Sequence, residues 1–227
     1  MSVAKKIPHR ETIFILGVGH NTNVYIELAE ACGYRVAGLY HYNDDRVGET
    51  IYNIPILDST NNLFKKTTLN NMCFAVSVGN NKIRVDLMRK INNLQGKTPT
   101  LIHPSAIVSR FAHLAEGVVV NANSVVQAEA TIEPYSVVSY NAAITHNCTI
   151  GLGTYVSAGA IVGAYVKVRE QVFIGQGANV VGDKVSYVKH NAFIGAGAVV
   201  IKNVEAHTTV VGNPGKLLEN KKNTNRN

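Results

Sequence analysis

The chain has 227 residues, of which 46% are hydrophobic and 16% charged, as is typical of a globular protein with one large domain or two small ones. Its net charge is +7, but Lys and Arg are scattered along the chain, which argues against a nucleic-acid surface. The positive charge suits an anionic small-molecule ligand as well as it suits a nucleic acid. It has no apolar run of membrane-helix length and no signal-peptide pattern, so we expect a cytoplasmic protein without membrane insertion.

Residues 1–98 alternate short apolar runs with helix-like segments. The apolar runs are 12–19 (TIFILGVG), 35–40 (RVAGLY) and 72–79 (MCFAVSVG), and the helix-like segments are 23–33 and 80–94. Alternation of this kind predicts a parallel sheet built by right-handed crossovers. We therefore expect an N-terminal α/β domain of Rossmann-like fold.

From residue 102 the chain repeats every six residues. Aliphatic residues recur at each sixth position from Ile102 to Val180, and small or β-branched residues recur two positions earlier, from Ala106 to Ala178. A period of six predicts a solenoid of short parallel strands, in which three hexads close one coil and residues eighteen apart stack. The phase slips after Val180 and resumes at Val188, which predicts a loop within 181–187. We assign 99–218 to this all-β domain and 219–227 to a flexible polar tail.

The hexads "VFIGQGANV" and "AFIGAGAVV", followed by "VVGNPGKLL", resemble the left-handed parallel β-helix of the hexapeptide-repeat acyltransferases. The segments "IFILGVGHN", "YNDD", "VGNNKIR" and "LIHPSAIVS" extend the resemblance to the two-domain acetyltransferases of bacterial surface-sugar biosynthesis, which include bacillosamine N-acetyltransferases and sialic acid O-acetyltransferases. The resemblance covers residues 12–218. It implies acetyl-CoA as co-substrate and a homotrimer with active sites between subunits.

The first apolar run ends in a turn with two glycines, Gly17 and Gly19, followed by His20 and Asn21. Such a turn before a helix presents backbone N–H groups and the positive end of the helix dipole to a phosphate, although a tight strand-to-helix turn is an alternative explanation. Thr22 occupies the place of the third glycine of a dinucleotide fingerprint, so NAD is not expected. The resemblance implies that this turn holds the pyrophosphate of a nucleotide-linked sugar.

Two further groups complete the predicted nucleotide site. Asp44 and Asp45 follow the second apolar run, where acidic residues accept hydrogen bonds from a ribose or base, and a solvated turn is the alternative. The resemblance also places Asn80 and Arg84 near the nucleotide, and for Asn80 helix capping is the alternative.

In the resembled enzymes, acetyl-CoA lies in the cleft between two adjacent solenoids and bonds mainly to backbone amides. This implies contacts from small residues at the coil corners, although the corner turns alone also require such residues. The candidates are Gly159, Gly163, Gly177, Ala196 and Gly197. The resemblance further places Gly212, Asn213 and Lys216 of "GNPGK" near the adenine end of the cofactor.

His146 follows the inward Ile144 by two residues, so its ring should point outward from a coil corner. A neutral imidazole can take the proton from an amine that attacks a thioester, and the resemblance makes His146 the general base, whereas an idle surface histidine is the alternative. The resembled enzymes commonly carry a carboxylate next, but here the residue is Asn147, which accepts a hydrogen bond without charge. Glu129 lies one coil before Asn147, and stacked coils bring such positions within about 5 Å of each other. Glu129 is therefore our candidate for the negative charge that Asn147 lacks, and a solvated corner residue is the alternative.

The sequence does not favour a metal site or a covalent acyl-enzyme. His103, His113, His190 and His207 lack zinc-ligand spacing, and the three cysteines lack a CxxC pair. Cys148 falls on the inward stripe, so direct attack in a ternary complex is expected.

We interpret the sequence as an N-acetyltransferase that acetylates the amino group of a nucleotide-linked amino or dideoxy sugar, for O-antigen or another surface polysaccharide or glycan. One alternative is a sugar O-acetyltransferase of the sialic acid type. Another, of a different class, is a non-catalytic solenoid that binds a nucleotide sugar.

Overall fold

The computed structural model describes residues 11–218, and the predicted tail 219–227 lies outside the described residues. Contacts between Cα atoms divide the chain into two compact units. Within the described residues, the first unit runs through Gly79 and resumes at Asp86–Pro99, and the second comprises Asn80–Val85 and the chain from Thr100. Nothing in the sequence pattern predicts that the short segment Asn80–Val85 belongs to the second unit.

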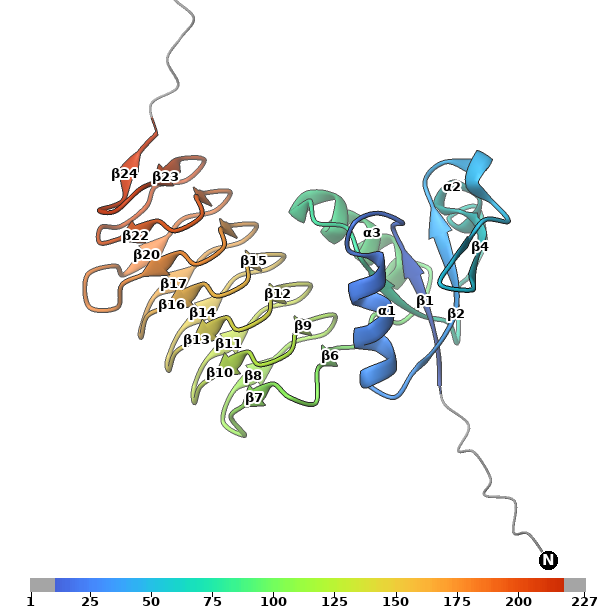
Figure 1. Ribbon diagram of the computed structural model, residues 1–227, viewed down its shortest axis with the longest axis horizontal. Coiled ribbons are helices and arrows are strands. Elements are labelled where there is room, and N and C mark those ends of the chain that lie inside the picture. The colour runs from blue at the N-terminus through green and yellow to red at the C-terminus, as the bar shows by residue number, and fades with distance from the viewer. Residues whose placement is uncertain (1–10, 219–227) are drawn as a thin grey trace, which may run out of the picture. The chain divides into compact units, whose positions relative to one another are not determined.

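The first unit is built on a five-stranded sheet with the order β3-β4-β2-β1-β5 (Figure 1). Strand β1 pairs in parallel with β2 and β5, β2 pairs in parallel with β4, and β3 pairs antiparallel with β4. The strands are β1 (Thr12–Leu16), β2 (Arg35–His41), β3 (Thr50–Ile51), β4 (Ile54–Ser59) and β5 (Cys73–Val76). The helices are α1 (Thr22–Ala31), the 3-10 helix η1 (Asp44–Arg46), α2 (Thr60–Leu63) and α3 (Asn81–Asn93). The predicted Rossmann-like domain is confirmed.

The apolar runs of the sequence form β1, β2 and β5 of this sheet. Ile13, Ile15 and Leu16 of β1 are fully buried, and all four residues of β5 are buried, as expected for strands covered on both faces. The β3–β4 hairpin was not predicted, because β3 has only two residues and β4 contains a proline and ends in Asp-Ser.

Strand β1 lies between β2 and β5, and the chain passes from one side of β1 to the other between these two strands. In open α/β sheets the carboxyl ends of the strands at such a reversal are where ligands bind. The turn at residues 17–21, which follows β1, and the segment Ser77–Gly79, which follows β5, leave the sheet at this edge.

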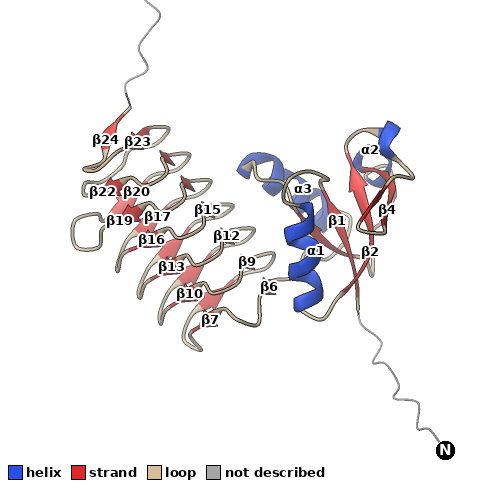
Figure 2. Ribbon diagram, in the orientation of Figure 1, coloured by secondary structure: helices blue, strands red, loops and turns tan. Residues whose placement is uncertain are grey.

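The second unit is a solenoid whose short strands form three parallel sheets, while helices are confined to the chain before β6 (Figure 2). The first sheet contains β7 (Ile107–Val108), β10 (Val125–Val126), β13 (Ala143–Ile144), β16 (Ile161–Val162), β19 (Asn179–Val180) and β22 (Val199–Val200). The second contains β8 (His113–Leu114), β11 (Thr131–Ile132), β14 (Thr149–Ile150), β17 (Lys167–Val168) and β20 (Tyr187–Val188). The third contains β6 (Leu101–Ile102), β9 (Val119–Val120), β12 (Val137–Val138), β15 (Tyr155–Val156), β18 (Phe173–Ile174), β21 (Phe193–Ile194), β23 (Thr209–Val211) and, antiparallel to it, β24 (Lys216–Leu217).

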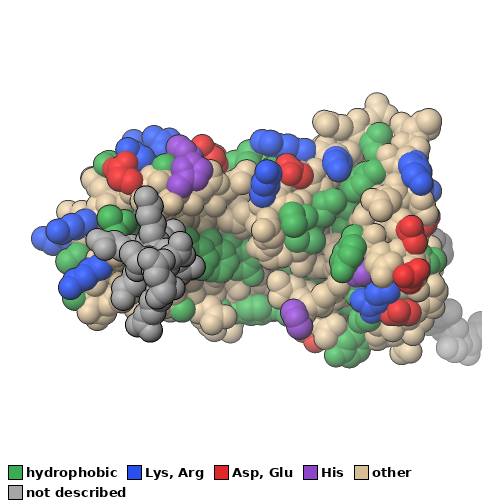
Figure 3. Space-filling view, turned by 90° about the horizontal axis from the view of Figure 1, so that it is seen from above, with side chains coloured by type: hydrophobic (Ala, Val, Ile, Leu, Met, Phe, Trp, Pro, Cys, Tyr) green, Lys and Arg blue, Asp and Glu red, His purple; other side chains and the backbone are tan. Residues whose placement is uncertain are grey.

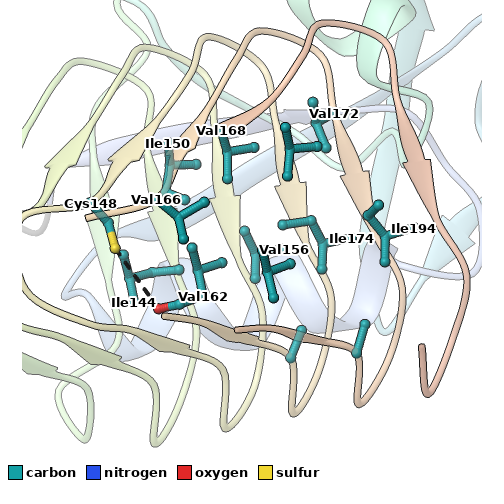
Figure 4. Packing of buried hydrophobic residues seen from close by; sticks show 14 of the residues in the cluster. Ile144, Cys148, Ile150, Val156, Val162, Val166, Val168, Val172, Ile174 and Ile194 are labelled. Atoms are coloured by element: carbon teal, nitrogen blue, oxygen red, sulfur yellow. Dashed lines mark hydrogen bonds between the residues drawn. The ribbon is translucent and has the colours of Figure 1, made fainter. Parts of the chain in front are cut away.

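Stacked strands pair residues eighteen apart, as in Val126 with Ile144 and Ile144 with Val162, so the predicted left-handed parallel β-helix is confirmed. Both predicted stripes point into the solenoid (Figure 4). From Val118 to Val180 every residue of the two stripes is at most 1% exposed. Repetition of aliphatic residues at a period of six is therefore what closes the core, since each coil buries its stripe against the next.

The predicted phase slip is a loop between Val180 and Tyr187, after which the inward stripe resumes at Val188. Val168 pairs with Val188, so this coil is two residues longer than the others below it. Val185 is buried within the loop and fills the core there.

The corners of the coils share one backbone conformation that the sequence analysis did not recognise. Every sixth residue from 117 to 177 has a positive φ, and Asn and Gly, the residues that tolerate this conformation best, hold most of these positions. The residues are Gly117, Asn123, Glu129, Tyr135, Asn141, Asn147, Gly153, Gly159, Tyr165, Gln171 and Gly177. Besides its two inward-facing stripe positions, each hexad thus contains a corner residue in the left-handed conformation.

Within the part of the chain that the structure describes, none of the helices has the length and apolar character that a membrane span requires. On the face shown in Figure 3, basic side chains are spread out with acidic ones among them.

Candidate functional site

The turn after β1 is shaped by Gly17 and by a buried threonine. Gly17 has φ +93°, and a Cβ there would lie 2.6 Å from Val78 Cγ2, so any other residue would be strained and would displace Val78. Its N–H donates to Tyr40 O at 3.0 Å, inside the sheet. Gly19 donates its N–H to Thr22 Oγ1 at 2.7 Å, and Thr22 Oγ1 donates to Gly19 O at 2.9 Å. Neither glycine amide is therefore free for a phosphate.

The backbone N–H groups of the next two residues, His20 and Asn21, remain available to a ligand. Among the described residues, the backbone N–H groups of His20 and Asn21 have no hydrogen-bond acceptor. Asn21 is the N-cap residue of α1 but makes no side-chain cap bond, and His20 is exposed. Of the four predicted turn residues, His20 and Asn21 are therefore the two whose backbone N–H groups remain available to a phosphate, next to the positive end of α1.

Asp44 and Asp45 lie in η1, directly after β2, and both are exposed. Asn43 caps this turn by accepting a hydrogen bond from the Asp45 N–H at 3.0 Å, and the Asn43 N–H donates to Nδ1 of the buried His41 at 3.0 Å. Neither Asp carboxylate has a side-chain partner among the described residues, so both remain available to a ligand. The sequence analysis missed His41 and Asn43, although an Asn two residues before an Asp is a recognised turn signal.

Asn80 and Arg84 lie at the start of α3 and belong to the second unit. Asn80 Oδ1 accepts a hydrogen bond from the Ile83 N–H at 3.0 Å, which is the helix-capping alternative. Arg84 is only 1% exposed and donates to Tyr135 O at 3.2 Å and to Gly153 O at 2.7 Å. Because these carbonyls belong to left-handed corners, Arg84 ties the segment Asn80–Val85 to the coils, and its deep burial leaves little of its surface for a nucleotide.

The first unit contains a cavity of about 310 Å³ beside α1. Its lining comes from α1, the start of β2 and the β3–β4 hairpin, and includes none of the predicted ligand residues. The free amides and carboxylates described above lie instead at the carboxyl ends of the adjacent parallel strands β1 and β2.

His146 lies at the corner between β13 and β14, and its side chain is exposed, as predicted. Its Nδ1 is 2.9 Å from Asn147 Oδ1. An amide oxygen can only accept, so Nδ1 carries the proton in this pair and the lone pair of Nε2 is free. Asn147 has φ +58°, which an asparagine adopts more readily than most residues. Asn147 therefore both forms the corner and determines which ring nitrogen of His146 carries the proton.

Two other side chains that the sequence analysis missed surround His146. Gln127 Oε1, from the coil below, accepts a hydrogen bond from the His146 N–H at 3.1 Å. The ring of Tyr165, from the coil above, meets the imidazole at 89° with 5.2 Å between centroids. Both lie nineteen residues from His146, close to the eighteen-residue stacking distance, and that spacing is the signal that could have found them.

Glu129 is exposed and makes no side-chain hydrogen bond or ion pair with any described residue. The geometry thus gives no support to the idea that Glu129 orients the ring, since Asn147 already does so. The ring is held by neutral groups only.

Cys148 points into the core, where its Sγ approaches Val162 O (Figure 4) and lies 2.9 Å from Gly163 O. Burial raises the pKa of this thiol, so it stays protonated and is a poor nucleophile. The expected absence of a covalent acyl-cysteine agrees with this placement.

The predicted cofactor glycines fall into two groups. Gly159, Gly177 and Gly197 have positive φ and open space beside them, but each N–H donates to a carbonyl of the coil below. A Cβ on Gly163 would collide with Gly182 N, so close stacking requires that glycine. Among the described residues, the Ala196 N–H has no acceptor, which makes it the one member of this set with a free amide.

The segment Gly212–Lys216 folds back as a hairpin in which Val211 pairs with Lys216. Gly212 has φ +88°, and its carbonyl accepts a hydrogen bond from Val199 N at 3.0 Å. Asn213 and Lys216 are exposed. No cluster of three or more metal-ligating side chains occurs within residues 11–218.

Comparison with known proteins agrees with this architecture. Residues 12–91 match the family described as the PglD N-terminal domain. The acetyltransferase domain of PglB from Neisseria gonorrhoeae, solved with acetyl coenzyme A, is 31% identical, covers 92% of this chain and 100% of its own, and has a TM-score of 0.83. A histidine-to-alanine variant of GDP-perosamine N-acetyltransferase from Caulobacter crescentus, solved with CoA and GDP-perosamine, is 27% identical over 92% of this chain and 97% of its own, with a TM-score of 0.84.

Curated relatives match mainly in shorter regions. Serine acetyltransferase of Escherichia coli is 34% identical over 119 residues, and the chain spans 37% of its length. The UDP-N-acetylbacillosamine N-acetyltransferase of Bacillus subtilis is 45% identical over 49 residues, which are 22% of this chain and 23% of that protein.

Proposed function

The chain belongs to the family of two-domain, hexapeptide-repeat sugar acetyltransferases that includes the PglB acetyltransferase domain, and on that premise we propose that it transfers acetyl from acetyl-CoA to the amino group of a nucleotide-linked amino sugar. The observation that carries the proposal is the corner at His146, where Asn147 Oδ1 fixes the protonated Nδ1 and leaves Nε2 free on an exposed side chain.

The chemistry follows from this arrangement. The sugar amine attacks the thioester carbonyl carbon, and His146 Nε2 takes a proton from the attacking nitrogen. The oxyanion of the tetrahedral intermediate needs a backbone N–H donor. Collapse of the intermediate breaks the C–S bond, and the proton held by His146 goes to the leaving CoA thiolate. Direct transfer fits the buried position of Cys148, the one cysteine near the histidine.

The substrate class is supported by the relatives and by the first unit. The Caulobacter enzyme binds GDP-perosamine, and the Bacillus enzyme is named for a UDP-linked amino sugar. In this chain, the free amides of His20 and Asn21 suit the pyrophosphate, and the unpaired carboxylates of Asp44 and Asp45 suit the hydroxyl groups of a ribose.

A homotrimer completes the proposal. The exposed corner at His146 offers only one side of a site, and the sheet that contains β13 carries outward apolar residues at Ile107, Val125, Ala143, Ile161 and Val199. Of these, Ile107 is 67% and Ile161 41% exposed, an apolar face typical of a subunit contact. A neighbouring copy on this face would provide the opposite side of the acetyl-CoA cleft.

The test is a panel of UDP-, dTDP- and GDP-linked 4-amino sugars incubated with acetyl-CoA, with release of free thiol as the readout and NMR of the product to locate the acetyl group. We expect an amide product that H146A abolishes without lowering the melting temperature. An ester product would instead establish the O-acetyltransferase alternative. Binding of a nucleotide sugar without thiol release under any condition would establish the non-catalytic alternative.

A further inference from the structure

Tyr165 occupies a left-handed corner that is unfavourable for an aromatic residue. Its φ is +64°, and most other corners of this type are held by Gly or Asn. The side chain is nevertheless 60% exposed, so burial in the core does not explain why a tyrosine is present. Large side chains held in this conformation at an exposed position suggest a role beyond folding.

The contacts of Tyr165 converge on His146. The Tyr165 N–H donates to His146 O at 3.3 Å, and the two rings form an edge-to-face pair 5.2 Å apart. The phenol hydroxyl has no hydrogen-bond partner among the described residues, so the ring makes the contact and the hydroxyl does not. Asn147 holds one edge of the imidazole, and Tyr165 meets the ring from the coil above.

We propose that Tyr165 is a positioning residue for His146: its ring limits the rotation of the imidazole so that Nε2 faces the acceptor amine. This inference rests on the proposed function. The hydrogen bond to Asn147 holds the imidazole at one atom only, and the Asn147 side chain is itself exposed. An edge-to-face contact between two rings favours one orientation of the imidazole over others.

The groups around the imidazole are few and can be varied separately. They are Gln127 from the coil below, Asn147 on the same corner and Tyr165 from the coil above, and the nearest carboxylate in the same column of corners, Glu129, makes no contact. Asparagine occupies other corners of this type, so Y165N removes the ring while keeping the backbone conformation. Y165F keeps the ring and removes the hydroxyl. D183N, at the next corner of the same column with φ +62°, is the matched control.

The experiment measures kcat and KM for acetyl-CoA in the full-length protein, with the best sugar of the panel above. We expect Y165N to lower kcat about fivefold to tenfold with little change in KM, as loss of about 1 kcal/mol of orientation would do. Y165F and D183N should stay within twofold of wild type. Wild-type kcat in Y165N would overturn the proposal. Equal losses in Y165F and Y165N would also overturn it, because they would assign the effect to the hydroxyl.

A second readout does not depend on turnover. In protein labelled with ¹⁵N-histidine, the ring protons of His146, assigned by their loss in H146A, should shift in Y165N and remain in place in Y165F. Absence of that shift would contradict the ring contact itself. The shift in a protein that acetylates no sugar of the panel would instead locate the failure in the proposed function and would end the positioning role for catalysis.

Discussion

Asn147 Oδ1 lies 2.9 Å from His146 Nδ1, and the same asparagine forms the left-handed corner at φ +58°. The pair assigns the proton to Nδ1 without a neighbouring charge. An imidazole oriented by a neutral amide is a weaker base than one paired with a carboxylate, because nothing negative stabilises its protonated form.

The two functions of Asn147 can be separated by substitution. N147G keeps a residue that adopts φ +58° freely and removes only the acceptor. We expect kcat to fall about fivefold to tenfold, the equivalent of about 1 kcal/mol for one hydrogen bond. Steady-state kinetics with a fixed saturating acetyl-CoA concentration would measure it, and an unchanged kcat would contradict the assigned tautomer.

N147D places a carboxylate at the same acceptor. The charge stabilises the protonated imidazole, so the acidic limb of the kcat/KM profile should move to higher pH, and activity should be lost sooner as the pH falls. E129Q is the control, since the Glu129 carboxylate makes no hydrogen bond or ion pair with any described residue. Its profile should match that of wild type, and a shifted acidic limb in E129Q would restore Glu129 as the source of charge.

Gly17 and Gly19 allow the nucleotide site to be tested apart from folding. A Cβ at Gly19 would meet no atom within 4 Å, whereas one at Gly17 would lie 2.6 Å from Val78 Cγ2 in a backbone with φ +93°. G19A should therefore keep the melting temperature and weaken nucleotide-sugar binding, while G17A should lower the free energy of unfolding by about 1–3 kcal/mol. Calorimetric titration and thermal unfolding measure the two effects. Unchanged affinity in G19A would argue against a ligand on this turn.

Arg84 should matter for stability. R84M keeps much of the side-chain volume but leaves Tyr135 O and Gly153 O without their donor, so we expect the free energy of unfolding to fall by about 2–4 kcal/mol. K82M, on the exposed side of the same helical turn, should change it by less than about 0.5 kcal/mol. Urea denaturation followed by circular dichroism compares them. Equal midpoints in the two variants would show that the buried guanidinium contributes nothing.

The three thiols should differ in reactivity. Burial raises the pKa of Cys73 to about 11, with the nearby Glu11 carboxylate adding to the effect, and burial also raises the pKa of Cys148. Because the thiolate is the reactive form, both should react slowly with a disulfide reagent at pH 8, and the half-buried Cys32 should react first. Fast modification of a second thiol in the native protein would contradict this, and full reaction after denaturation is the control.

The sequence was sufficient for the fold because the fold depends on repetition. The stripes that include Ile144 and Cys148 repeat at a spacing that only a stacked coil can bury, and the apolar runs of β1, β2 and β5 are long enough to be recognised singly. The site was harder to predict, because its contacts join residues from different coils. Gln127 and Tyr165 reach His146 through stacking, and nothing in their immediate neighbours in the chain points to it.

The hydrogen bonds that the predicted ligand groups make within the protein could not be foreseen for a related reason. Gly17 and Gly19 were expected to offer their amides, but a threonine hydroxyl and a strand carbonyl occupy them, which is a matter of three-dimensional hydrogen bonding. The family resemblance places Arg84 near a nucleotide, and the structure adds that its guanidinium bonds to corner carbonyls distant in sequence. The local sequence pattern predicted the turn after β1 and the helix that begins near Asn80. It did not indicate which donor and acceptor atoms of these segments remain without a hydrogen bond.

The stacking of residues eighteen apart also limits which insertions and deletions the solenoid can absorb. A whole extra coil preserves the orientation of every later residue and only lengthens the protein. An insertion of one hexad before His146 would leave the inward stripes in place but rotate the histidine by one face, away from Gln127. In the coils that precede His146 in the sequence, changes in length should therefore be tolerated only as complete coils. The longer coil at 181–187 follows His146, so its extra residues do not change the position of the histidine.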